Sequence, residues 1–267
     1  MIVTVCIGRG GSKGFPGKNK YRVLGKELMA WPLLAAKCCK EINRVYFSTD
    51  DGELAAIAKW YGAEVIDRPP ELSTDAALGE DVFAHAYQSI KASAEDRIKL
   101  VVLLFANAPC VTSQMLTEMI RKLRESENMM GGRYDSICTV SEYEMFHPSR
   151  CRVIDGPLLR PFCPYVAAGS TSDRRSGGDS WFYDCCAAVV QPKNLEHLDR
   201  GMPPQRWLGT LVLPYKQQFP ALDVDYKWQV PQVEEWLRRY AQYPACDLPG
   251  DEVHTVKWEE FCSDQNT

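Results

Sequence analysis

The feature of this sequence that most constrains its fold is a regular alternation of short apolar runs with longer amphipathic stretches. The runs IVTVCI (2–7) and KLVVLLFA (99–106) have the length and composition of buried strands. Buried strands that alternate with helical stretches favour a mostly parallel sheet with helices on both faces, an α/β fold. The predicted strands are 2–7, 44–49, 63–67, 99–106, 135–141, 181–191 and 208–215, and the predicted helices are 27–42, 51–62, 78–93, 112–126 and 230–242.

Residues 142–180 interrupt this alternation. They contain several prolines and glycines, followed by the polar stretch AAGSTSDRRSGGDS, a composition typical of extended segments, hairpins and loops. The simplest organisation is a single domain over residues 1–245 with an inserted arm at about 142–180 and a C-terminal tail at 246–267. We see no internal repeat and no low-complexity segment.

Composition and charge argue against several classes of partner. The 267 residues carry a net charge of −4, which favours neither a nucleic acid nor an anionic membrane. No apolar run approaches the roughly 20 residues of a membrane span, and the N-terminus lacks the pattern of a signal peptide. We therefore expect a cytoplasmic protein whose 11 cysteines, which lack zinc-ligand spacing, are reduced and mostly buried.

A glycine-rich, cationic loop follows the first predicted strand: GRGGSKGFPGKN, residues 8–19, here called the cradle loop. In open α/β sheets, ligands bind at the carboxyl ends of the strands. Glycines let the backbone approach a ligand, and successive exposed N–H groups bind anions. Arg9, Lys13 and Lys18 add positive charges suited to phosphate oxygens. The loop therefore predicts a polyphosphate site; the alternative is a merely flexible surface loop.

The cradle loop matches neither of the two common phosphate-binding motifs. The Walker motif requires Ser or Thr after its lysine, whereas Asn19 follows Lys18. The dinucleotide-binding motif opens a helix, whereas Pro16 and the residues after it prevent a helix from starting here. The loop thus indicates a nucleotide site of another kind.

The segment LDVDY (222–226) contains a candidate metal site. Residues two apart on an extended chain point to the same face, so Asp223 and Asp225 would present their carboxylates together. Two carboxylates beside phosphate oxygens suit Mg²⁺, which takes few protein ligands and keeps several waters. The alternative is a solvated turn, in which Asp is common. For Asp50 and Asp51 we favour helix capping over a role in binding.

The cradle loop resembles the signature, RGGSKG followed by PGKN, of the cytidylyltransferases that activate acidic sugars, such as acylneuraminate cytidylyltransferase. Supporting stretches follow in the same order: STDD (48–51), DRPPELSTD (67–75), LLFANAP (103–109), DSICTVS (135–141) and LDVDY (222–226). The resemblance, which runs from residue 1 to about 240, implies a Rossmann-like nucleotidyltransferase fold that uses CTP and a divalent metal, Mg²⁺. It also implies transfer of CMP to the hydroxyl of an acid, with release of pyrophosphate.

The same resemblance assigns residues to the site. It implies that the nucleotide is bound by Gly8, Arg9, Gly10, Gly11, Ser12, Lys18, Asn19 and Arg68. It implies that Asp223 and Asp225 bind the metal, so the reaction depends on these two residues together with Arg9 and Lys18. Arg68 is expected near the cytosine, and the alternative for it is a salt-bridged loop residue.

The acceptor half departs from the family pattern. In LLFANAP, Phe105 replaces a glutamine that would touch the sugar, and Asn107 and Ala108 replace Thr and Ser. We assign Phe105 and Asn107 to the acceptor site, but these replacements leave the identity of the acid open.

The charged stretch SDRRSGGDSWFYD (172–184) is a second candidate for the acceptor site. Arg174 and Arg175 could hold the acceptor's carboxylate or a phosphonate, and the alternative is a solvated or dimer-contacting loop. Asp179 and Asp184 are further acceptor-side candidates.

The predicted function is transfer of CMP from CTP to a sialic-acid-like keto sugar acid. The alternatives are cytidylylation of a phosphonate or another acidic acceptor, and a non-catalytic nucleotide-binding protein on the same fold. The family forms dimers through the insertion that matches the arm, so the resemblance also implies a homodimer.

Overall fold

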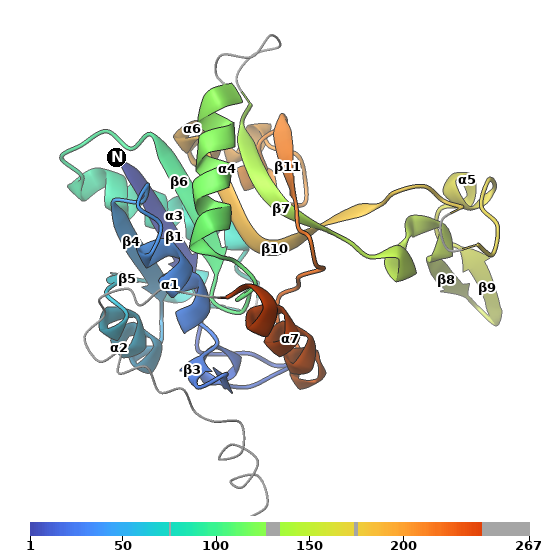
Figure 1. Ribbon diagram of the computed structural model, residues 1–267, viewed down its shortest axis with the longest axis horizontal. Helices are drawn as coiled ribbons and strands as arrows, with labels where there is room; N and C mark the ends of the chain where they lie inside the picture. Colours follow the sequence, from blue (N-terminus) through green and yellow to red (C-terminus); the bar gives the residue numbers. More distant parts are fainter. Residues whose placement is uncertain (75, 127–133, 174–175, 242–267) are drawn as a thin grey trace, which may run out of the picture.

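A seven-stranded sheet forms the centre of the computed structural model, which describes residues 1–74, 76–126, 134–173 and 176–241 (Figure 1). The strand order is β11-β7-β10-β6-β1-β4-β5. Strand β10 is antiparallel to β6 and β7, and the other neighbours pair in parallel, which confirms the predicted α/β fold. The strands are β1 (Ile2–Ile7), β4 (Arg44–Thr49), β5 (Glu64–Asp67), β6 (Leu100–Phe105), β7 (Ser136–Glu142), β10 (Trp181–Val190) and β11 (Val212–Lys216).

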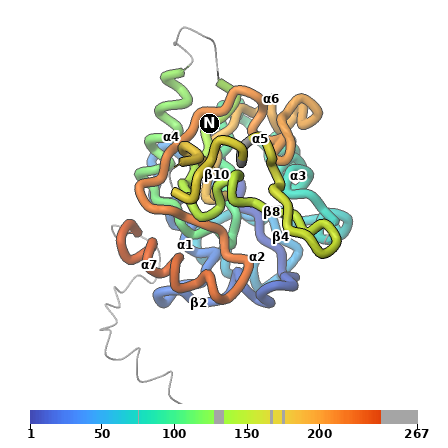
Figure 2. Tube along the Cα trace, turned by 90° about the vertical axis from the view of Figure 1, so that its right-hand side faces the viewer, coloured from blue at the N-terminus to red at the C-terminus, as the bar shows by residue number. Residues whose placement is uncertain are grey.

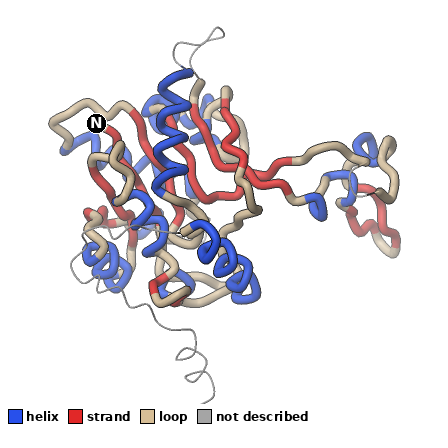
Figure 3. Tube along the Cα trace, viewed as in Figure 1, coloured by secondary structure: helices blue, strands red, loops and turns tan. Residues whose placement is uncertain are grey.

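Helices cover both faces of this sheet (Figure 3). Side chains alternate across β1, so Ile2 and Cys6 join one buried cluster with α1, α2 and α4, whereas Val3 and Val5 join another with α3 and α6. A third cluster joins α7 to the cradle loop. The helices are α1 (Ala30–Lys37), α2 (Gly52–Trp60), α3 (Gly79–Ser93), α4 (Ser113–Glu125), α5 (Pro164–Ala167), α6 (Pro192–Glu196) and α7 (Val230–Tyr240). Short 3₁₀ helices are η1 (Lys18–Lys20), η2 (Pro70–Leu72), η4 (Glu144–Phe146), η5 (Pro148–Arg150), η6 (Leu198–Arg200), η7 (Arg206–Leu208) and η8 (Lys227–Gln229).

Two predicted helix starts are confirmed by their caps. The Asp51 carboxylate accepts hydrogen bonds from two backbone N–H groups in the first turn of α2, and the Thr112 hydroxyl caps α4 by accepting one, from Met115. The predicted helix at 27–42 is wrong at both ends, because α1 spans only Ala30–Lys37. Before it, the chain forms a hairpin of β2 (Arg22–Val23) and β3 (Lys26–Glu27), which turns through two residues with positive φ.

The inserted arm projects away from the main sheet, and Figure 2 shows it from its end. A separate hairpin of β8 (Arg152–Asp155) and β9 (Leu158–Pro161) lies within it. Large apolar side chains of the arm are exposed, among them Ile154 at 79%, Leu159 at 68% and Tyr165 at 96%. The proposed tail at 246–267 lies outside the described residues.

The cysteines of the described residues mostly follow expectation. Eight are free thiols: Cys6, Cys39, Cys110, Cys138, Cys151, Cys163, Cys185 and Cys186. Cys38 is disulfide-bonded, so the expectation of reduced thiols is wrong at that position. Within the described part of the chain, no helix has the length and apolar character needed to cross a membrane.

Candidate active site

The cradle loop begins where β1 ends, at the carboxyl edge of the sheet. The backbone N–H of Gly8 donates to the Ser48 carbonyl at the end of β4, at 3.1 Å. A Cβ atom at Gly8 would lie 2.7 Å from the Ala106 side chain and 2.8 Å from the Phe47 ring. Glycine is therefore required at this position, because the backbone passes too close to the core for any larger residue.

Polar contacts hold the two ends of the cradle loop together. The side-chain amide of Asn19 is buried and donates to the Arg9 carbonyl at 3.1 Å. The Arg9 guanidinium donates to the Thr74 carbonyl at 3.1 Å, and the Gly10 N–H donates to the Asp50 carboxylate at 3.3 Å. These contacts give the loop a defined shape, which argues against the alternative of a merely flexible loop.

A cavity of about 240 Å³ opens beside the cradle loop. Nine of the predicted site residues line it: Gly8, Arg9, Gly11, Ser12, Lys18, Asn19, Arg68, Phe105 and Asn107. A larger hollow of about 1190 Å³ lies elsewhere, beside the first residue of β6 and the C-terminal end of α3, and contains none of the predicted site residues. We take the smaller cavity as the candidate site because it combines glycine backbone, cations and the carboxyl ends of parallel strands.

Arg68 is buried at the wall of this cavity. Its guanidinium donates to the carbonyl of Ser48 at 2.7 Å and to the carbonyl of Gly8 at 3.3 Å. Burial lowers the pKa of Arg68 from its ordinary value. The side chain thus fastens the end of β4 to the start of the cradle loop, and it does so by bonds to carbonyls rather than by the salt bridge of the alternative interpretation.

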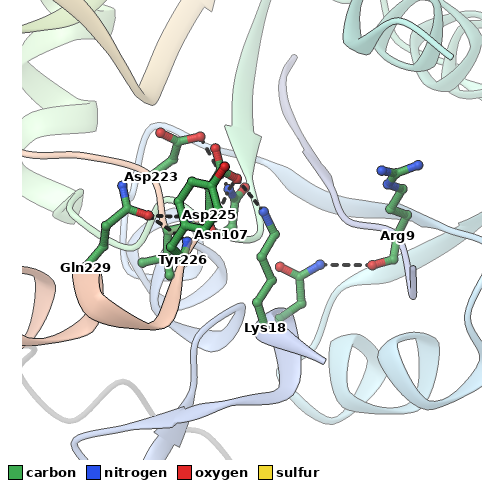
Figure 4. Close-up of polar contacts among 9 residues, drawn as sticks. Arg9, Lys18, Asn107, Asp223, Asp225, Tyr226 and Gln229 are labelled. Atoms are coloured by element: carbon green, nitrogen blue, oxygen red, sulfur yellow. Dashed lines mark hydrogen bonds and ion pairs between the residues drawn. The ribbon is translucent and has the colours of Figure 1, made fainter. Parts of the chain in front are cut away.

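Asp223 and Asp225 converge on one side chain next to the cradle loop, as Figure 4 shows. The amide nitrogen of Asn107 lies 3.4 Å from a carboxylate oxygen of Asp223 and 3.5 Å from one of Asp225. The same nitrogen donates to the Val224 carbonyl at 3.1 Å. The two carboxylates therefore share a face, as the spacing predicts, and Asn107 is engaged with the segment that carries them.

Lys18 joins the cradle loop to this pair of carboxylates. Its ammonium group lies 2.7 Å from an oxygen of Asp225. Burial, and then the charge of Asp225, raise the pKa of Asp223 above its usual range. Two neighbouring carboxylates, one of them partly buried, form a site where a cation would offset their mutual repulsion.

The donor set fits Mg²⁺. Carboxylate oxygens are hard ligands, and Mg²⁺ sites commonly combine one or two carboxylates with substrate phosphates and waters. Within the described residues, no group of three or more His, Cys, Asp or Glu side chains is arranged to hold a metal. Asp223 and Asp225 would therefore hold the ion only together with a ligand such as a nucleotide phosphate.

The acceptor-side predictions have mixed outcomes. Phe105 lines the cavity and packs edge-on against Phe83, with ring centroids 5.2 Å apart. Asp184 is only 5% exposed, and both its oxygens accept hydrogen bonds from protein groups, so it does not face the cavity. Asp179 is exposed, and Arg174 and Arg175 lie outside the described residues.

Sequence reasoning missed the residues that hold the segment carrying Asp223 and Asp225, residues 217–225, here called the carboxylate segment. The side-chain oxygen of Gln229 accepts hydrogen bonds from the backbone N–H groups of Asp225 and Tyr226, both at 2.7 Å. A glutamine three residues after Tyr226, just before an amphipathic helix, is a capping signal that could have identified this contact. Asp184, Thr139 and Ser141 gave no such signal, because they lie far from Asp223 in sequence.

Comparison with known proteins decides the family. The sequence model described as Cytidylyltransferase matches residues 4–153, more than half of the chain. This chain belongs to the cytidylyltransferase family. The match includes the cradle loop and Arg68 but stops before Asp223 and Asp225.

Several curated members of the family are similar to this chain. The N-acylneuraminate cytidylyltransferase of Oncorhynchus mykiss is 31% identical over 200 residues, which cover 68% of this chain and 44% of that protein. The N-acylneuraminate cytidylyltransferase of Escherichia coli O18:K1:H7 is 36% identical over 85 residues, 32% of this chain and 20% of that protein. The CMP-N,N'-diacetyllegionaminic acid synthase of Campylobacter jejuni is 31% identical over 110 residues, 41% of this chain and 46% of that protein. The chain thus spans less than half the length of each of these relatives.

Solved structures confirm the Rossmann-like fold. A CMP:2-keto-3-deoxy-manno-octonic acid synthetase solved with CTP has a TM-score of 0.60 at 12% identity and covers 89% of this chain and 98% of that one. The 4-diphosphocytidyl-2C-methyl-D-erythritol synthase of Anaerococcus prevotii has a TM-score of 0.55 at 13% identity and covers 89% of this chain and 96% of that one. At such low identity the likeness bears on the fold alone.

Proposed function

We propose that this protein transfers CMP from CTP to the hydroxyl of an acidic sugar and releases pyrophosphate. The observation that carries the proposal is the contact between Lys18 and Asp225, which joins a glycine-rich anion site to a pair of carboxylates. A triphosphate in the cavity would therefore lie between fixed positive charge and a metal-binding group. Membership of the cytidylyltransferase family supports CTP as the nucleotide.

In this proposal the protein acts mainly by positioning and by neutralising charge. Arg9 and Lys18 bind phosphate oxygens, and the backbone N–H groups of the cradle loop orient them. Asp223 and Asp225 would hold Mg²⁺, which when bound offsets the charge that develops on the transferred and leaving phosphates. The acceptor hydroxyl attacks the α-phosphorus opposite the bond to the leaving pyrophosphate.

For the acceptor we propose a sialic-acid-like keto sugar acid. The similar proteins named for N-acylneuraminate and legionaminic acid support this class. Phe105 gives the cavity an apolar wall, which packs against the buried rings of Phe83 and Trp207. A phosphonate remains the alternative acceptor, and a non-catalytic nucleotide-binding protein is the alternative of another class.

The test is a screen for pyrophosphate release with CTP, Mg²⁺ and a panel of acidic sugars and phosphonates. We expect release that requires the metal and a keto sugar acid. Thermal unfolding adds a nucleotide test, because a ligand that binds only the folded state raises the melting temperature. CTP should raise it more than ATP, GTP or UTP, and equal shifts from all four would contradict a site specific for cytosine.

We also propose that the protein is a cytoplasmic homodimer with no nucleic-acid or membrane partner, joined through the arm. The exposed apolar side chains of the arm, such as Ile154 and Leu159, would gain a buried environment against a second copy. Ile154→Asp and Leu159→Asp should shift the mass measured by light scattering from dimer to monomer. Trp60→Asp is the control, since Trp60 is 66% exposed on α2, in the body of the domain. A monomeric parent protein would contradict this proposal.

A further inference from the structure

The metal-binding carboxylates lie on a segment with no regular secondary structure. Residues 217–225 connect β11 to η8, and within them the chain forms neither helix nor strand. Besides the Asp225 N–H, which donates to Gln229, three backbone N–H groups tie the segment to the rest of the domain. Gln217 donates to the Val140 carbonyl at 3.0 Å, Ala221 to the Ser141 hydroxyl at 3.0 Å, and Val224 to the Asn107 carbonyl at 2.7 Å.

The buried carboxylate of Asp184, on β10, connects two of these attachment points. One of its oxygens accepts from the Ser141 hydroxyl at 2.7 Å and from the side-chain NH₂ group of Gln217 at 3.2 Å. The other oxygen accepts from the Thr139 hydroxyl at 2.5 Å and from the Cys186 N–H at 3.0 Å. Because Ser141 in turn receives the Ala221 N–H, Asp184 fixes the segment at residue 217 directly and at residue 221 through one hydroxyl.

The backbone of β10 is irregular where it presents this side chain. The pairing of β10 with β7 shifts register between Tyr183 and Ala188. Within this interval Cys185 has φ of 60°, a left-handed conformation that is costly for a residue other than glycine. Irregularities of this kind redirect side chains, and this one places Asp184 between β7 and the carboxylate segment.

The four groups that donate to Asp184 are all neutral. A buried carboxylate without a cationic partner is costly, and burial raises the pKa of Asp184 above its usual range. An apolar or amide side chain would avoid this cost. An apolar side chain, however, would leave the donors of both Gln217 and Cys186 without this acceptor, and an amide would leave one of the two without it.

We propose that Asp184 is a positioning residue, which holds residues 217–225 so that Asp223 and Asp225 face the cradle loop. The proposal deepens the proposed function and rests on it for the role of the two metal-binding carboxylates. Asp184 does not contact the substrate in this account. It acts through Ser141 and Gln217.

The principal test compares Asp184→Asn with Asp135→Asn. Asparagine keeps the shape of Asp184, but its NH₂ group must face an N–H donor, either that of Cys186 or that of Gln217. Asp135 is also buried, at 7% exposure, and it accepts from two backbone N–H groups at the opposite end of β7. The control therefore removes a similarly buried, hydrogen-bonded charge, which is also paired with Lys193 at 2.6 Å, at a place remote from the segment.

Hydrogen exchange followed by mass spectrometry provides a readout that needs neither metal nor turnover. In Asp184→Asn, the amides of residues 217–225 should exchange about tenfold faster, whereas in Asp135→Asn they should keep the parent rate. The Mg²⁺ concentration for half-maximal pyrophosphate release should rise about tenfold in Asp184→Asn, with CTP affinity in the absence of metal nearly unchanged. Equal exchange and equal Mg²⁺ midpoints in the two variants would overturn the proposal.

Ser141→Ala keeps the test decisive if Asp184→Asn does not fold. This change removes only the hydroxyl that links Asp184 to Ala221. It should speed exchange around Ala221 and raise the Mg²⁺ midpoint about threefold. If the protein releases no pyrophosphate from CTP, the proposed function fails, whereas exchange at 217–225 still decides whether Asp184 positions the segment.

Discussion

The two halves of the candidate site are held by different kinds of contact. The cradle loop is held by the end of the neighbouring parallel strand β4, where the Ser48 carbonyl accepts from the Gly8 N–H, and by its own Asn19, whose side chain donates to the Arg9 carbonyl. The segment 217–225 is held by buried side chains of β7 and β10 and by Asn107 after β6. The first half is therefore held by the ends of neighbouring parallel strands and by its own Asn19, whereas the second is held by buried side chains at an irregular part of the sheet.

Two of the contacts between these halves can be changed to separate them. The ion pair between Lys18 and Asp225 is one of them. The other is Gly14, where an added Cβ would lie 2.8 Å from the Asp225 carbonyl oxygen. On the proposed function, substitutions in residues 217–225 should affect metal dependence, those in the cradle loop should affect nucleotide affinity, and those at the contacts should affect the coupling between the two.

The largest effect is expected from removing the charge of one carboxylate in residues 217–225, that of Asp223 or that of Asp225. Asp223→Asn or Asp225→Asn should each lower turnover by about two orders of magnitude, since loss of a preorganised charge at a reacting phosphate costs roughly 3–4 kcal/mol. The fold should persist, because the charge of Asp225 disfavours ionisation of Asp223 in the folded protein. Steady-state pyrophosphate release measures the effect, and circular dichroism checks the fold.

The control for these variants is Asp96→Asn, which changes an exposed carboxylate between α3 and β6. CTP calorimetry without metal should give the parent affinity for all three proteins, because the cradle loop is unchanged. Near-normal turnover and metal dependence in both Asp223→Asn and Asp225→Asn would show that this pair is a solvated turn and that the metal is bound elsewhere.

A smaller effect, on nucleotide affinity rather than on the metal, is expected from a change in the cradle loop. Lys18→Ala should weaken CTP binding about tenfold even without metal, because a charge-assisted contact to phosphate contributes about 1.5 kcal/mol or more. The affinity for Mg²⁺ alone should not fall, since Asp225 is released from its ion pair. Calorimetry with CTP and with Mg²⁺ separately distinguishes the two.

Lys20→Ala is the matched control for Lys18→Ala. Lys20 belongs to the same short helix η1, but its ammonium group pairs with Glu53 at the start of α2. The control should bind CTP with nearly the parent affinity. If Lys20→Ala weakens CTP binding as much as Lys18→Ala does, the effect of Lys18 reflects the overall charge of the loop rather than a specific contact.

The sequence predicted the cradle loop better than it predicted the contacts of residues 217–225. The cradle loop and β1 were predictable because the glycines, cations and strand lie together within residues 2–19. The shared face of Asp223 and Asp225 was predictable from their spacing alone. The role of Asp184 was not, since it depends on a register shift between β7 and β10 that no local pattern encodes. Helix α1 was overestimated at its start, where Glu27 pairs in the β2–β3 hairpin, and at its end, where the chain leaves the helix after Lys37.

The smallest effect is expected at the packing contact between the halves. In Gly14→Ala, the new methyl group would lie 2.8 Å from the Asp225 carbonyl oxygen and 3.1 Å from the Tyr226 ring. The backbone oxygen cannot rotate away, so the cradle loop and the carboxylate segment must move apart. The Mg²⁺ midpoint with CTP present should rise about threefold, and stability should fall by about 1 kcal/mol.

The control for Gly14→Ala is Gly52→Ala at the first residue of α2, where an added Cβ meets nothing within 4 Å. Alanine there should leave the Mg²⁺ midpoint unchanged and should not destabilise the protein, because alanine favours helix more than glycine does. The informative measurement is the affinity for CTP with and without Mg²⁺. Separation of the halves should reduce only the increase in CTP affinity that Mg²⁺ provides. If Gly14→Ala keeps the full increase, the two halves do not need this contact, and Lys18 alone couples the nucleotide to Asp223 and Asp225, the carboxylates proposed to bind the metal.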